Sequence, residues 1–141
     1  MLSKSYADAL ISLMLEQGSF YAHVISELQP VESKEVPIAG VTIGTPIKLL
    51  INLDTFDKLP LRQRKGVLKH EVLHLVWEHF LREQGRNHEL FNLSCDLAIN
   101  EYIASELPEG VPTVARLNHD LGLKLPARAS AEEYYDLLKD K

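Results

Sequence analysis

Apolar residues recur at helical spacing in the first part of the chain. Leu10, Leu13 and Met14 lie within one turn of each other, so residues 5–17 predict an amphipathic helix. Gly18 followed by Ser19 predicts a helix stop and a new N-cap, with a second helix that continues through residue 28. Both helices are expected to contribute packing surface and no chemistry.

Two short β-branched runs follow. Residues 41–43 and 47–53 predict a hairpin or two neighbouring strands, because a Gly-Thr-Pro turn separates them. Residues 29–35 contain Pro30 and alternating charges and are expected to form a surface connection.

A long helix is predicted for residues 60–82. Pro60 fits its first position and Gly85 its C-terminal stop. Its apolar residues point in nearly every direction, which is typical of a helix buried on all sides.

The rest of the chain is predicted to be helix and loop. A further helix is expected for residues 89–106, and residues 108–128 are expected to be mostly loop. Ser130 and Glu133 form a capping box for a last helix through Leu138. Because the strands come together and do not alternate with helices, the pattern predicts an α+β fold with a small, mostly antiparallel sheet.

Composition narrows the class of protein. The 141 residues, 45% of them hydrophobic, suit a single domain over residues 1–141. The single cysteine, Cys95, excludes an internal disulfide framework and favours a cytoplasmic setting. The net charge of −5 argues against a nucleic-acid partner, and no apolar stretch is long enough for a signal peptide or a membrane span.

The candidate chemistry lies in the predicted long helix, in the pattern H-E-x-x-H formed by His70, Glu71 and His74. The two histidines lie about 40° apart on one helix face, so both imidazoles can reach one tetrahedral ion. Glu71 lies to one side, off the metal but within reach of a water bound to it. This arrangement is typical of a zinc hydrolase in which the glutamate is the general base.

The surroundings of the motif favour a site over a solvated face. Two histidines and a glutamate inside an apolar helix need partners or a metal. Gly66 lies one turn before His70 and has no side chain, so it either leaves room for a substrate or is a tolerated helix glycine.

The third ligand must come from another element. The extended pattern H-E-x-x-H-x-x-G-x-x-H is excluded, because Trp77 and Phe80 stand at the glycine and histidine positions. His79 would lie about 180° from His70 on a continuous helix, so it could join the same ion only if the helix were broken.

Asp96 is the preferred third ligand. It is a carboxylate on an otherwise apolar helix, on one face with Asn92 and Asn100. The alternatives are that Asp96 caps a turn or pairs with an arginine. The arginines in question are Arg82 and Arg86, and the fallback ligands are Glu101, Glu89 and His88.

Other reactive residues have weaker contexts. Cys95 is expected to be a small buried core residue, since no histidine base is apparent for it. His23 and His119 are isolated histidines, although His119 and Tyr102 are both candidates to stabilise an oxyanion beside the metal.

These motifs resemble a known family. Residues 68–79 and residues 91–100 are similar to the metallopeptidase-like domain of bacteria and phages that commonly precedes a von Willebrand factor A-like domain. Phe20 and Tyr21, residues 51–53 and residues 131–135 extend the likeness over nearly the whole chain.

The resemblance implies a zincin-like fold with one zinc ion per chain. It implies that His70, His74 and Asp96 bind the metal, that Glu71 is the catalytic base and that Asn100 is a neighbouring polar residue. It also implies that the strand over residues 47–53 can pair with an extended peptide. The family's usual second domain is absent from this sequence, so the chain is expected to be either a stand-alone form or a fragment. A separate regulatory protein or a missing C-terminal domain is an expected partner beside a peptide or protein substrate.

Two functions remain open at this point. The first is a zinc metallopeptidase that uses Glu71 and a metal-activated water. The second is a non-catalytic module in which the same fold binds metal for structure or binds a partner protein. A fourth protein ligand on the metal would favour the second.

Overall fold

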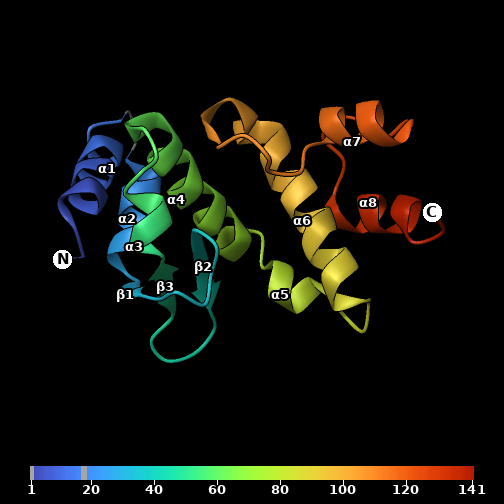
Figure 1. Cartoon of the computed structure of the whole chain (residues 1–141). Helices are drawn as coiled ribbons and strands as arrows, with labels where there is room; N and C mark the ends of the chain where they lie inside the picture. The colour runs from blue at the N-terminus through green and yellow to red at the C-terminus, as the bar shows by residue number, and fades with distance from the viewer. Residues whose placement is uncertain (1, 17–18) are drawn as a thin grey trace. The chain divides into compact units, whose positions relative to one another are not determined.

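A computed structural model describes residues 2–16 and 19–141. The described chain is a mixed α+β structure with a three-stranded sheet (Figure 1). Its contacts define two compact units, Met1–Leu73 with Glu106–Pro108 and His74–Ser105 with Glu109–Lys141. The expectation of a single domain stays a prediction.

Two helices open the first unit. Helix α1 spans Lys4–Met14, and the Ser3 hydroxyl accepts a hydrogen bond from the Tyr6 backbone N–H at its start. Helix α2 spans Phe20–Ser26. The predicted stop at Gly18 lies outside the described residues, as does residue 17. Ser19 is the N-cap residue of α2, as predicted, but its backbone is left-handed and its side chain makes no capping hydrogen bond.

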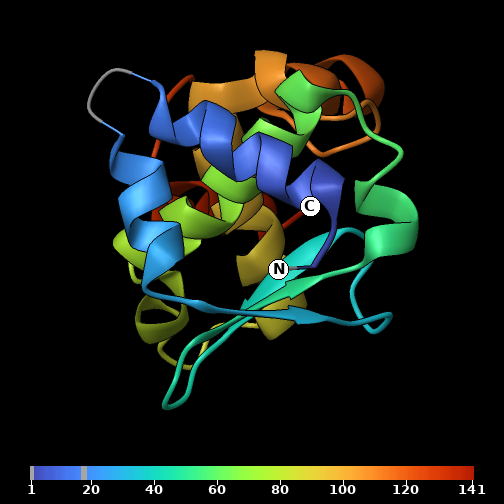
Figure 2. The ribbon, with the colours of Figure 1, turned by 90° about the vertical axis from the view of Figure 1, so that its left-hand side faces the viewer.

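The sheet has three strands, β1 (Gln29–Glu32), β2 (Ala39–Thr42) and β3 (Lys48–Ile51), in the order β1-β3-β2. Strand β2 is antiparallel to β3, which confirms the two predicted neighbouring strands. Strand β1 is parallel to β3, so the sheet is mixed and the prediction of a mostly antiparallel sheet is wrong. Figure 2 shows β3 between its two neighbours, with α1 and α2 over one side of the sheet.

Strand β1 was expected to be a surface connection because it contains Pro30. The strand forms because Pro30 lies on an edge strand, where one missing N–H is tolerated. The Gln29 N–H donates to the Ile47 carbonyl and the Ser33 N–H donates to the Ile51 carbonyl. The bonds to β3 therefore come from alternate residues, and the proline nitrogen is not needed for them.

The central position of β3 in the sheet contradicts the expectation that residues 47–53 pair with an extended peptide. Leu49 and Ile51 of this strand are buried, and both of its backbone edges pair with neighbouring strands. A strand with both edges paired cannot add a peptide strand. Residues 47–53 therefore do not pair with a substrate.

Two helices follow the sheet along the chain. Asn52 caps the short helix α3 (Leu53–Phe56) by accepting a hydrogen bond from the Asp54 N–H. Helix α4 then spans Leu61–Val76 and carries residues 70–74.

The predicted helix over residues 60–82 is not continuous. It ends at Val76, and helix α5 (His79–Arg82) follows as a separate short helix. Glu78 between them adopts a left-handed backbone with φ of 54°, which breaks the helical path. No glycine or proline marks this break in the sequence.

The second unit is helical. It contains α5, α6 (His88–Ile103), α7 (Val114–Leu121) and α8 (Ala131–Leu138), and a 3-10 turn, η1 (Ala104–Glu106), follows α6. The capping box of Ser130 and Glu133 is confirmed. Helix α7 corrects the expectation of loop over residues 108–128: Thr113 caps its start and Gly122 ends it in the left-handed conformation.

Helices α6 and α8 lie side by side and enclose the core of the second unit (Figure 1). Its buried residues are Phe91, Cys95, Leu97, Ala98, Val114, Leu125, Ala131, Tyr134 and Leu138. This core fixes the helix face on which Asp96 lies. Among the described residues, no helix combines the length and apolar character needed to cross a membrane.

Candidate metal centre

Helix α4 sets the spacing of the two histidines of the H-E-x-x-H motif. His70 and His74 both lie within the continuous helix Leu61–Val76, four residues apart, so their side chains project from the same face one turn from each other. Both side chains are partly buried. The helical setting predicted for the motif is therefore present.

Asp96 of helix α6 faces His74. Its Oδ1 lies 3.1 Å from the His74 Nε2. This separation is close to the roughly 3.4 Å expected between two ligand atoms that each lie about 2.1 Å from a tetrahedral zinc. The pair can therefore serve either as a hydrogen bond or as two ligands of one ion.

The three residues together could hold a metal ion. One ligand atom from each of His70, His74 and Asp96 lies within 4.8 Å of the others. Two imidazole nitrogens and one carboxylate oxygen suit zinc and other first-row divalent metals, and three protein ligands leave a coordination position for water. The donor set therefore fits the metal that the sequence implies.

Glu71 and Asn100 are two buried polar residues that lie near these ligands in the sequence. Glu71 follows His70 in α4 and is 8% exposed. Asn100 lies one turn after Asp96 in α6, is 1% exposed and donates from Nδ2 to the Pro112 carbonyl at 2.7 Å. Asn100 thereby holds the loop that leads into α7.

The arginines considered as partners of Asp96 bind other groups. The Arg82 guanidinium forms a two-point contact with the Glu132 carboxylate, its Nε lying 2.8 Å from Oε2. Arg86 donates to the backbone carbonyls of Arg82 and Glu83. These contacts of both arginines thus lie with groups other than the Asp96 carboxylate, which faces His74.

The fallback ligands have contacts of their own. The Glu101 carboxylate accepts a hydrogen bond from the Arg128 backbone N–H at 3.0 Å. His88 is largely exposed and lies 2.7 Å from the Glu83 carboxylate, and Glu89 is exposed. In the part of the chain that the structure describes, the metal-binding group contains none of these three residues.

Gly66 has a packing partner. The backbone of Glu106 fills the space beside it, and a Cβ placed on Gly66 would come 2.6 Å from the Glu106 carbonyl carbon. This close approach explains why residue 66 has no side chain. The sequence alone suggests two other reasons, room for a substrate or a glycine merely tolerated in a helix.

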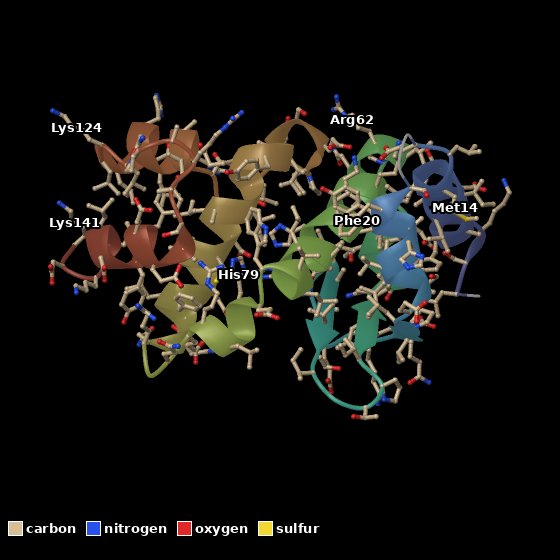
Figure 3. The ribbon with its side chains drawn as sticks, turned by 180° about the vertical axis from the view of Figure 1, so that it is seen from behind. Met14, Phe20, Arg62, His79, Lys124 and Lys141 are labelled. Carbon is tan, nitrogen blue, oxygen red and sulfur yellow. The ribbon has the colours of Figure 1, made fainter. Side chains whose placement is uncertain are left out.

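His79 lies near the candidate metal centre, where an unbroken helix would not have placed it. The break at Glu78 brings its Nδ1 to 3.2 Å from the His74 Nδ1, although a continuous helix would have directed it away. His79 is 4% exposed, and Figure 3 labels it at the start of α5 next to α6. Burial, together with the charges of His74 and Arg82, lowers the pKa of His79 to about 4.

The other candidate residues lie in different surroundings. The Tyr102 side chain is about half exposed, with its ring against Trp77 and under the Arg128 guanidinium. His119 is exposed and contacts Asp120. Cys95 is buried in the core, as expected, and burial raises the pKa of its thiol to about 12. The roles of Tyr102 and His119 beside the metal stay predictions.

Comparison with known proteins agrees with the motifs. A relative in Thermotoga maritima, an uncharacterized protein, is 33% identical over 101 residues, which cover 69% of this chain and 25% of that protein. The chain thus spans about a quarter of the length of this relative. No solved structure matches the chain.

A family model covers nearly the whole chain. Residues 3–141 match the family described as "Putative metallopeptidase domain". The match includes α4 with its two histidines and α6 with Asp96. The chain belongs to this metallopeptidase domain family.

Proposed function

We propose that this domain is a zinc-dependent metallopeptidase with a zincin-like fold, and that its substrate is a peptide or protein. The observation that carries the proposal is the group of His70, His74 and Asp96, whose ligand atoms lie within 4.8 Å of one another. The buried Glu71 directly follows the first ligand in the sequence. Membership of the metallopeptidase domain family supports the same reaction class.

The three ligands come from two helices. Helix α4 supplies two imidazoles whose spacing is set by the helical repeat, and α6 supplies the carboxylate. A bound zinc ion supplies Lewis acidity, which lowers the pKa of a coordinated water toward about 7.

Glu71 is the proposed general base. Its carboxylate takes a proton from the attacking water and passes it to the nitrogen of the leaving amine. Because Glu71 is the neighbour of His70 in the helix, its side chain is offset by about 100° from the ligand face. It can therefore serve the water without occupying the metal.

The composition of the group favours catalysis over a structural role. Within the described residues the group has three members, and no fourth His, Cys, Asp or Glu belongs to it. Structural zinc is usually closed by four protein ligands, whereas catalytic zinc keeps a position for water. A non-catalytic metal-binding or protein-interaction module is the competing outcome of the tests below.

The first experiment measures zinc per chain by elemental mass spectrometry for wild type, Asp96→Asn and Glu89→Gln. Glu89 is an exposed carboxylate on the same helix and is the matched control. The expected result is about one zinc per chain in wild type and the control, with loss or strong weakening in Asp96→Asn. Equal zinc in all three proteins would remove Asp96 from the site.

The second experiment separates metal binding from chemistry. Glu71→Gln should keep zinc and lose hydrolysis of a fluorescence-quenched peptide library, whereas His74→Ala should lose both. Unchanged hydrolysis by Glu71→Gln would contradict the general-base role. Zinc binding in wild type without hydrolysis of any peptide in the library would favour the non-catalytic module.

A further inference from the structure

The ring of His74 meets a different group at each of its nitrogens. Its Nε2 lies 3.1 Å from the Asp96 Oδ1, and its Nδ1 lies 3.2 Å from the His79 Nδ1. A neutral imidazole carries one hydrogen, so a ring that offers the Nε2 lone pair to a metal must carry its hydrogen on Nδ1. That hydrogen points at His79.

His79 is built into this position at a cost. Glu78, the residue before it, has a left-handed backbone, a conformation that L-residues adopt at a cost in free energy. The ring is almost fully buried and packs edge-on against the rings of His74 and Trp77. Its other nitrogen, Nε2, has no hydrogen-bond partner among the described residues. The polar contact that the structure gives this buried ring is therefore the one with His74.

We propose that His79 is a positioning residue for the metal centre, which accepts a hydrogen bond from the His74 Nδ1 and so directs the His74 Nε2 toward the metal. The inference rests on the proposed metal site and adds a residue to it. A ligating histidine commonly donates its second ring N–H to a fixed acceptor, which sets the tautomer and the orientation of the ring.

Metal loading then reverses the direction of one hydrogen bond. Without metal, the His74 Nε2–H donates to Asp96, and the His79 Nδ1–H donates to the His74 Nδ1. With metal, the His74 Nδ1–H donates to the His79 Nδ1, and the hydrogen of His79 is on Nε2. Each ring carries one hydrogen in both states, so the exchange of tautomers itself releases no proton.

Three variants test the proposal. His79→Phe keeps a ring of similar size and removes the acceptor, whereas His79→Asn places an amide oxygen near the position of Nδ1. His119→Asn removes an exposed histidine on α7 and controls for adventitious zinc binding. Zinc affinity is measured for each by competition with a chelating dye.

We expect zinc affinity to fall about 10–100-fold in His79→Phe and to return to within about threefold of wild type in His79→Asn. The His119→Asn protein should bind zinc as wild type does. Wild-type affinity in His79→Phe, or equal weakening in His79→Phe and His79→Asn, would overturn the positioning role.

Two further readouts separate positioning from a structural effect. Metal-free His79→Phe should unfold at about the wild-type temperature, because the variant loses the hydrogen bond to His74 but also removes a buried nitrogen that has no partner among the described residues. Nitrogen-15 NMR of the zinc-loaded wild type should place the His74 hydrogen on Nδ1, and a hydrogen on Nε2 would overturn the proposal. If wild type binds no zinc at all, the proposed metal site is wrong and the positioning role is rejected with it. If wild type and His79→Phe bind zinc with equal affinity, the metal site stands and only the positioning role is rejected.

Discussion

The backbone of Glu106 lies against the α carbon of Gly66, so close that no Cβ fits between them. The same glutamate binds the Lys69 ammonium through its side chain at 2.8 Å, one turn further along α4. Lys69 also lies 3.4 Å from Glu16, and it is nearly buried. Glu106, the last residue of the 3-10 turn η1, is thus fixed to α4 by one backbone contact and one ion pair.

Gly66→Ala should destabilise the protein. Alanine would gain up to about 1 kcal/mol of helix propensity, but its Cβ would overlap backbone atoms that cannot rotate away, an overpacking that costs about 1–3 kcal/mol or more. We expect a net loss of about 1–2 kcal/mol in the free energy of unfolding, measured by urea denaturation. Arg62→Ala, at an exposed position of the same helix, should change it by less than about 0.5 kcal/mol. A Gly66→Ala protein as stable as wild type would show that the Glu106 backbone yields.

The ion pair of Arg82 and Glu132 should make stability depend on pH. The hydrogen bond from Arg82 holds the pKa of Glu132 below its ordinary value of 4.5, so the unfolded chain binds a proton at a higher pH than the folded chain. The stabilisation is therefore complete above the ordinary value and is lost as pH falls through the lowered one. Glu132→Gln should lose about 1 kcal/mol at pH 7. The difference from wild type should shrink below about pH 4.5, and a difference that stays constant from pH 3 to 7 would contradict this account.

Cys95 should be unreactive in the folded protein. Its side chain is 1% exposed, and burial followed by the charge of Asp96 raises the pKa of the thiol to about 12. Because the thiolate is the reactive form, Ellman's reagent at pH 8 should label no thiol in the native protein and one thiol per chain in guanidinium chloride. Rapid labelling of native protein would place Cys95 outside the core.

Tyr134→Phe should destabilise the second unit. The buried hydroxyl donates to the Pro126 carbonyl at 2.7 Å and accepts from the Ala129 backbone N–H at 3.1 Å. Its removal leaves two backbone groups without this partner, which we expect to cost about 1–3 kcal/mol in chemical denaturation. Tyr102→Phe changes a half-exposed tyrosine of the same unit and should have little effect. Equal losses in both variants would argue against a specific role for the buried hydroxyl.

The helical periodicity was enough to place much of the candidate site. The spacing of His70 and His74 needs only a helix, and the apolar residues around Asp96 predict that its carboxylate requires a partner. The contact between His74 and Asp96 agrees with both inferences. Their ligand roles stay predictions until metal is measured.

Helical periodicity could not predict the position of the His79 side chain. Apolar residues continue through Trp77 with no glycine or proline, so propensity favours an unbroken helix, whereas Glu78 adopts the left-handed conformation. Tertiary packing of the buried His79 ring accompanies this break. A local signal for α7 did exist, because Thr113 and Gly122 have the spacing of an N-cap and a C-terminal glycine.

The proline of β1 has a consequence for self-association. Gln29 and Ser33 direct their N–H groups at β3, so alternation directs the nitrogen of Pro30 toward the open side of the sheet. At Pro30 an incoming strand would meet the proline ring and not a backbone N–H donor. The side of β1 that no described strand covers is thereby a poor template for another chain, so Pro30 disfavours aggregation through this edge.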